Sequence, residues 1–219
     1  MSDDDARNAL PAYVRGLLEP SAYPTPPSEV RLVQTHISYV FLAGDVVYKT
    51  KKPVDFGFIE QLSVERRHLF CDAEVRLNRR LAPDVYLDVV PVLQRADGTF
   101  CVEPADGQGE VVEWAVKMRR LPDYVTLDRL IAEHREPSDI LERLVKAIVP
   151  FHEHADVVPN DPAFAGAEGE RGWWKREFGE AEGFIGSTWT PEDAAATKAF
   201  ADATIEREAA LFDQRLAEG

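Results

Sequence analysis

The sequence has few of the features that secreted and membrane-spanning chains need. Only two of its 219 residues are cysteines, Cys71 and Cys101, and their spacing suits neither a metal site nor a disulfide framework. No apolar run approaches the roughly 18 residues that cross a bilayer, and the N-terminal MSDDDARNAL is acidic where a signal peptide is basic. We therefore expect a cytoplasmic protein, in a reducing compartment, that has no membrane partner.

The sequence also has fewer basic than acidic residues. Lysine and arginine number 25 against 39 aspartates and glutamates, which gives a formal net charge of -14. A surface field of that sign repels polyphosphate chains, so we expect no nucleic-acid partner, and a cationic small substrate would suit the field better. With 45% apolar residues, the chain can bury the core of one large domain or of two lobes.

Strand patterns follow a short N-terminal segment. Residues 6–18 predict a helix, and EPSAYPTPP after it is too rich in proline to be helical, which predicts a linker or wrapping arm. Three β-branched and aromatic runs then occur at 30–36, 39–45 and 46–52. Ala43-Gly44-Asp45 joins the last two and suits a tight hairpin. We predict a three-stranded antiparallel meander.

A helix and three more strands are predicted next. Ser63 suits the N-cap of the helix and Pro83 lies beyond its end. The apolar stripe of this helix is Phe70, Ala73, Leu77 and Leu81. The turn Ala96-Asp97-Gly98 separates strands at 85–94 and 99–104, and a third strand alternates over 110–120. Its alternation places on one face Val112, Trp114, Val116 and Met118.

From Leu121 the pattern becomes helical. Helices are predicted at 126–134, at 138–155 and over a long run at 190–218 that opens with the cap-like TPED. The stretch 159–189, rich in glycine and aromatic residues, reads as a loop or a broken helix. The fold class is α+β, with an antiparallel sheet and one helix before a helical second half.

The strand at 46–52 carries the candidate site. A strand lysine reaches the phosphates of a nucleotide when a carboxylate on the next helix fixes its ammonium group. Lys49 is the candidate lysine because it lies in mid-strand, on the side of Val47 and Lys51, whereas Lys51 lies at the frayed end before Pro53. Glu74 is the candidate acid, about 40° around the helix from Phe70. Each residue taken alone is better read as an ordinary surface charge, and only the topology favours the pair.

Asp55-Phe56-Gly57 matches the metal-binding tripeptide of protein kinases, but its position is wrong for that role. In kinases the tripeptide follows the catalytic loop, far beyond the strand lysine, whereas here it comes six residues after Lys49. We interpret Val54–Phe58 as the turn from the third strand to the helix, with glycine relieving the backbone and both phenylalanines packing into the sheet.

Three stretches together resemble a known family: THISYVFLAGDVVYKTKKPVDFGF, ERRHLFCDAEVRLNRRLAPDVYLDVVPV and EWAVKMRRLPD. They resemble the aminoglycoside phosphotransferase-like family, a branch of the protein-kinase-like fold. Within it, the chain is similar to a bacterial group in which such a domain often precedes a P-loop kinase-type domain. The resemblance implies ATP as phosphoryl donor, Mg²⁺, and a hydroxylated small-molecule acceptor.

The resemblance also implies a domain organisation and a set of site residues. A kinase-like N-lobe would occupy 30–120, after an N-terminal helix and proline-rich arm at 1–29 and before a partial helical C-lobe at 121–219. Lys49 would contact phosphates and Glu74 would hold it. His36 and Ser38 would stand where kinases have a glycine-rich loop. Met118 and Arg120 would lie at the adenine-binding hinge.

The catalytic loop of that family contains His-Gly-Asp and a later Asp binds Mg²⁺, and neither is found after Leu121. His152 lies on an apolar helix stripe, which predicts a packed core histidine, and it cannot share a metal with His154 at i, i+2. The resemblance implies that the chain stops before the catalytic loop. We expect the nucleotide-binding portion of a small-molecule phosphotransferase, inactive as this isolated chain. The alternatives are a pseudokinase-type regulatory or interaction module, and a lobe that self-associates through uncovered helices.

Overall fold

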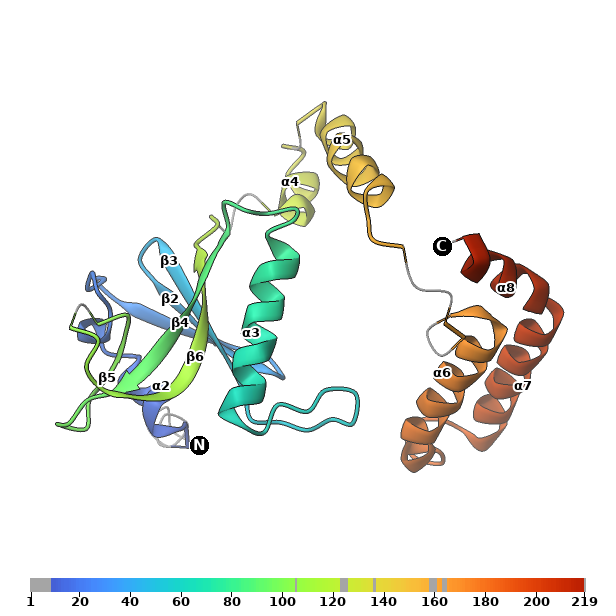
Figure 1. Ribbon diagram of the computed structural model, residues 1–219, viewed down its shortest axis with the longest axis horizontal. Helices are drawn as coiled ribbons and strands as arrows, with labels where there is room; N and C mark the ends of the chain where they lie inside the picture. The colour runs from blue at the N-terminus through green and yellow to red at the C-terminus, as the bar shows by residue number, and fades with distance from the viewer. Residues whose placement is uncertain are drawn as a thin grey trace. The chain divides into compact units, whose positions relative to one another are not determined.

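The computed structural model describes residues 9–104, 106–122, 126–135, 137–157, 161–162 and 165–218. The protein is a mixed α/β structure built around a curved antiparallel sheet, with several helices (Figure 1). The chain divides into two compact units, Met1–Ala147 and Ile148–Gly219.

Six strands form the sheet of the first unit. They are β1 (Val30–Gln34), β2 (Ser38–Ala43), β3 (Val46–Lys51), β4 (Tyr86–Gln94), β5 (Phe100–Val102) and β6 (Glu110–Arg119). Their order across the sheet is β1-β2-β3-β6-β4-β5, and every neighbouring pair is antiparallel. The predicted meander and strand order along the chain are confirmed. Gly44 at the hairpin tip has a φ of 63°, a backbone conformation that glycine adopts without strain.

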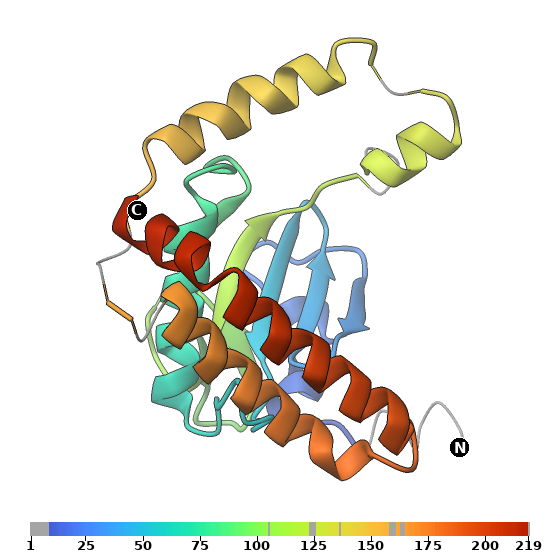
Figure 2. The ribbon, with the colours of Figure 1, turned by 90° about the vertical axis from the view of Figure 1, so that its right-hand side faces the viewer.

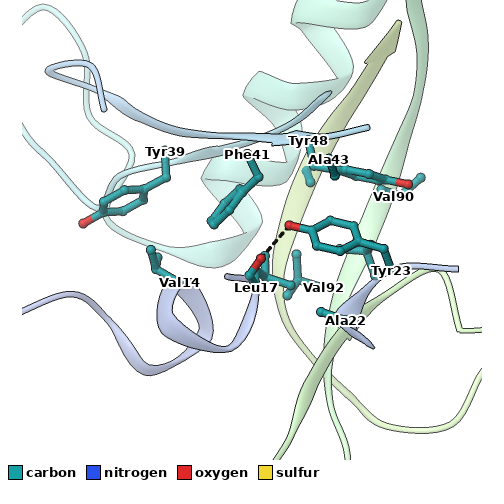
Figure 3. Close-up of a cluster of buried hydrophobic side chains, with 12 residues drawn as sticks. Val14, Leu17, Ala22, Tyr23, Tyr39, Phe41, Ala43, Tyr48, Val90 and Val92 are labelled. Carbon is teal, nitrogen blue, oxygen red and sulfur yellow. Dashed lines mark hydrogen bonds between the residues drawn. The ribbon is translucent and has the colours of Figure 1, made fainter. Parts of the chain in front are cut away.

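One face of the sheet encloses the main core together with the N-terminal segment. Val14 and Leu17, in and just after α2 (Ala12–Gly16), are fully buried against Phe41 of β2 (Figure 3). The proline-rich arm, which includes the short 3₁₀ helix η1 (Pro20–Ala22), buries Tyr23, whose hydroxyl donates to the Leu17 carbonyl oxygen at 2.6 Å. Within the described residues the helix is shorter than predicted, because Pro11 at its N-cap is not helical.

The helix α3 (Val64–Asn78) packs on the other side of the sheet, against β3, β4 and β6. Its predicted N-cap is confirmed, since the Ser63 side chain accepts a hydrogen bond from the Arg66 backbone N–H. The predicted apolar stripe is wrong, because Leu77 and Leu81 are exposed. The residues that α3 buries are Arg67, Cys71 and Val75.

A register shift explains a second error on β6. Val92 pairs with Glu113 whereas Leu93 pairs with Val111, so the β6 residue between them, Val112, is skipped. Val112 therefore packs with the main core, while Trp114, Val116 and Met118 pack with α3.

The loop between β3 and α3 presents its phenylalanines to solvent. Gly57 has the predicted left-handed backbone, with a φ of 81°. Phe56 and Phe58 stack on each other with ring centroids 6.1 Å apart, and Phe58 is 74% exposed. The expectation that both rings pack into the sheet is wrong, because the bridge between Asp55 and Glu60 closes the loop as its own small hairpin.

Two of the predicted helices follow the sheet: α4 (Leu127–Ala132) and α5 (Ile140–Glu153). Along α5 no residue is buried, and its apolar stripe includes Leu141 and Val145. His152 is exposed, so its interpretation as a packed core histidine is wrong. Its ring instead makes an edge contact with Phe151.

The second unit is helical. It contains α6 (Gly166–Ala181), η3 (Glu182–Phe184), α7 (Pro191–Arg207) and α8 (Ala209–Glu218), with α6 and α7 side by side (Figure 2). Thr190 caps α7 as its sequence indicated, and Glu208 interrupts the single long helix that we predicted. The stretch predicted as a loop or broken helix contains the regular helix α6. No helix in the described ranges is long and apolar enough to span a bilayer.

Candidate functional site

Strand β3 places its lysines on the face that carries α3. Val46 and Tyr48 pack in the main core, so the alternation of a strand directs Lys49 and Lys51 to the opposite face. Because α3 lies over β3 and β6 there, a carboxylate on its sheet-facing side is within reach of both ammonium groups.

Glu74 of α3 binds both lysines. Its Oε1 accepts from Lys49 Nζ at 2.8 Å, and its Oε2 accepts from Lys51 Nζ. The expected contact between Lys49 and Glu74 is therefore present, with a second lysine that we had not predicted. Burial alone would raise the pKa of Glu74, but hydrogen bonds from the two lysines outweigh it, so the pKa lies below its usual value.

Lys51 is the functional candidate that sequence reasoning missed. We had placed it at a frayed strand end, yet its side chain is 8% exposed, against 25% for Lys49. Gln61 lies at this end, because its amide donates to the carbonyl oxygens of Lys52 and Ile37, the residues next to the ends of β3 and β2. The spacing already placed Lys51 on the face of Lys49, since i and i+2 on a strand share a face, but the adjacent Pro53 argued for a frayed end.

A second ion pair ties the start of α3 to β6. Arg67 Nε donates to Glu113 Oε2 at 2.7 Å, with side-chain exposures of 7% and 1%. Its Nη1 donates to the carbonyl oxygens of Gln61 and Leu62. The arginine therefore fixes both the helix and the loop before it.

Cys71 lies in the cluster beneath α3 and adds no negative charge to the site. Its Sγ is 3.8 Å from the Trp114 carbonyl oxygen, and burial raises the pKa of its thiol to about 12 despite the nearby Lys51. One carboxylate thus faces two ammonium groups, which leaves Lys49, Lys51 and Glu74 with a net charge of about +1.

His36 and Ser38 lie at the Lys51 end of this strip. Ser38 pairs with Lys51 across β2 and β3 and is fully buried, and its Oγ has no hydrogen-bond partner among the described atoms. His36, in the loop between β1 and β2, is exposed. Both are near the strand end that carries Lys51, and neither forms part of the contact with Glu74.

Met118 and Arg120 lie toward the opposite end of β3. Met118 pairs with Val47 and packs with the α3 cluster. Arg120 is held away from Glu74, since its backbone N–H donates to the Asp45 carbonyl oxygen and its guanidinium to that of Gly44. At about 3.3 Å per residue, the six-residue step from Asp45 to Lys51 spans about 20 Å, with Lys49 between the two groups.

An apolar strip borders Lys49 on the same face. Val40 pairs directly with Lys49, and Val33 of β1 pairs with Val40. Val40 is half-buried and Val33 is 36% exposed. This part of the sheet can therefore offer apolar surface beside a cationic group.

The site thus combines a curved antiparallel sheet with a strand lysine and a helix carboxylate.

Comparisons with known proteins show relatives for part of the chain. The chain is 31% identical over 122 residues to uncharacterized proteins of Mycobacterium bovis and of two Mycobacterium tuberculosis strains, CDC 1551 and H37Rv. The match covers 56% of this chain and 22% of each relative, so the chain spans about a fifth of their length. No protein-family model and no solved structure matches.

Proposed function

We propose that the sheet and α3 form the ATP-binding lobe of a small-molecule phosphotransferase of the aminoglycoside phosphotransferase-like, protein-kinase-like type. The observation that supports it is the ion pair between Lys49 on the third strand and Glu74 on the helix that follows. In phosphoryl-transfer enzymes of that type, such a pair holds the lysine against the nucleotide phosphates.

The surroundings of Lys49 suit a nucleotide. The net positive charge of the lysine pair with Glu74 favours the phosphates, and Lys49 is the more exposed of the two ammonium groups. The apolar strip at Val40 and Val33 suits a purine ring, whereas Met118 lies on the other side of β3, toward the start of that strand. His36 and the backbone of its loop would lie toward the phosphates, whereas the buried Ser38 would support the loop.

Mg²⁺ would accompany ATP in an enzyme of this type. Among the residues that the structure describes, no group of three or more His, Cys, Asp or Glu side chains could hold a metal ion. When bound, Mg²⁺ would supply charge neutralisation on the phosphates. The residues of this chain would contribute phosphate binding through Lys49, and the hydroxylated acceptor and its site remain part of the proposal for the whole polypeptide.

The test is ATP binding by isothermal titration calorimetry, in wild type and Lys49→Met. We expect Lys49→Met to weaken binding by about tenfold or more, because a charged hydrogen bond to phosphate is lost. Lys117→Met is a matched control: Lys117 pairs with Glu103 at 2.8 Å and is 26% exposed, but it shares the opposite sheet face with Tyr48. Its affinity for ATP should match that of wild type.

The results separate three outcomes. Equal affinity of Lys49→Met and wild type for ATP would contradict the proposal. Selective loss in Lys49→Met supports it, and we then expect this chain to transfer no phosphate by itself. ATP binding in a longer polypeptide that still transfers no phosphate to hydroxylated acceptors would favour the pseudokinase-type regulatory module.

A further inference from the structure

We infer that Lys51 is the permanent partner of Glu74, and that it thereby leaves Lys49 available to bind an anionic ligand. Lys51 would be a positioning residue, acting on Lys49 through the shared carboxylate. The identity of the anion as a nucleotide rests on the proposed function, whereas the division of roles between the lysines rests on the geometry of the carboxylate alone.

The two lysines bind different oxygens of Glu74. Lys49 Nζ contacts Oε1 at 2.8 Å and Lys51 Nζ contacts Oε2, so the two contacts do not compete for one oxygen. Lys51 is 8% exposed and Lys49 is 25% exposed. A ligand that approaches from solvent can therefore reach the Lys49 ammonium group, while that of Lys51 is enclosed.

The other charged groups near Glu74 leave the unbalanced positive charge on Lys49. Arg67 and Glu113 neutralise each other in a buried pair, and the Cys71 thiol stays protonated at neutral pH because burial raises its pKa to about 12. His68, whose ring stacks on Trp114 of β6, contacts Asp72 within α3. The positive charge that Glu74 does not balance therefore lies on the accessible side of the site.

Lys51 lowers the free-energy cost of moving the Lys49 ammonium group away from Glu74. Without Lys51, a ligand that drew Lys49 away would leave the half-buried Glu74 carboxylate without a cation, which is unfavourable. With Lys51 in place, Glu74 keeps a charged hydrogen bond while Lys49 turns to the ligand. When Lys51 is removed, Glu74 should therefore hold Lys49 more tightly, and the affinity for the ligand should fall.

The first test is a set of variants titrated with ATP and with inorganic tripolyphosphate: Lys51→Met, Lys51→Arg, Glu74→Gln and the double variant Lys51→Met/Glu74→Gln. We expect Lys51→Met to weaken binding by about tenfold, and Glu74→Gln in that background to restore most of the loss by releasing Lys49. Lys51→Arg should bind within about threefold of wild type, since the cation is kept. A double variant that binds no better than Lys51→Met overturns the inference, because a merely structural role predicts no recovery.

The second test needs no ligand. Acetylation of Lys49 by an N-hydroxysuccinimide ester, followed by mass spectrometry, should be severalfold slower in Lys51→Met than in wild type, with Lys117 as the internal reference. If circular dichroism shows that Lys51→Met does not fold, Lys51→Gln replaces it in both tests. Unchanged Lys49 reactivity overturns the inference, whereas slower acetylation together with no ATP binding by wild type would reject the nucleotide and keep the division of roles.

Discussion

At the scale of residues, the ion pairs that involve the sheet differ in how far they are removed from water. Arg67 and Glu113 are almost fully buried, whereas Lys117 and Glu103 are each about one-quarter exposed. Burial raises the pKa of Glu113, and hydrogen bonding to the Trp114 backbone N–H and the charge of Arg67 oppose that rise. A buried pair is costly to break from one side, because the remaining charge has neither water nor a partner.

We expect Arg67→Met to lower the free energy of unfolding by about 3–5 kcal/mol, since Glu113 would lose its cation in the interior. Urea unfolding followed by circular dichroism measures the change. The neighbouring Arg66→Met is the control, because Arg66 is 51% exposed and its pair with Glu60 should contribute less than about 1 kcal/mol. Equal losses in the two variants would contradict this account.

The sequence predicts part of the site residue by residue. Lys49 and Glu74 were predicted as a pair from the order of strand and helix along the chain, and strand alternation gave the side of Lys49. Helix periodicity helped less, because it placed Glu74 relative to an apolar stripe that was wrong. The role of Lys51 was not predicted, because the strand end before Pro53 was expected to fray, whereas the folded loop returns there and Gln61 donates to the Lys52 carbonyl oxygen. The buried pair Arg67 and Glu113 was missed for a similar reason, since charged residues are expected outside until a partner is known.

At the scale of elements, strands were easier to predict than helix faces. Runs of β-branched and aromatic residues predicted all six strands, and Ala43-Gly44-Asp45 predicted the hairpin between β2 and β3. The face of α3 was misassigned because its buried row contains Arg67, which a hydrophobic stripe excludes. The helix α6 was missed because it contains several glycines and no clear stripe, while its buried residues are the small Gly166 and Ala167.

The contact between α2 and β5 gives a prediction for a helix glycine. A Cβ at Gly16 would lie 2.6 Å from Cδ2 of Phe100 and 2.9 Å from its Cβ. We expect Gly16→Ala to lower the free energy of unfolding by about 1–3 kcal/mol, although alanine favours helices, because the helix must move off the sheet. Scanning calorimetry and urea unfolding measure the effect.

Gly172→Ala in α6 is the control for that substitution. No heavy atom among the described residues lies within 4 Å of the added Cβ, so the helix should be unchanged or gain up to about 1 kcal/mol. A stabilised Gly16→Ala protein would show that α2 does not pack on Phe100 as described.

At the scale of the whole molecule, α5 carries an exposed apolar stripe. Leu141 is 73% exposed, Val145 57% and Ile148 45%, and helical spacing places them on one side. Such a surface favours self-association. We expect the protein to form dimers or larger species as its concentration rises, measured by sedimentation velocity.

Two α5 variants test that expectation. Leu141→Glu together with Val145→Glu should weaken association by about tenfold, because charge is placed on the apolar stripe. Arg143→Glu is the control, since Arg143 is exposed and lies on another side of the helix. A wild-type protein that sediments as a monomer at every concentration would rule out this use of α5.

The two buried cysteines allow local opening around the sheet to be measured by thiol alkylation. Cys71 is covered by the contact of α3 with β6, and Cys101 lies in β5, where Arg95 Nε donates to its Sγ at 3.3 Å. A thiol reagent can reach the first only when α3 lifts, and the second only when the β4 and β5 edge opens. Their separate alkylation rates would therefore report two different openings, that of α3 and that of the β4 and β5 edge, without any introduced label.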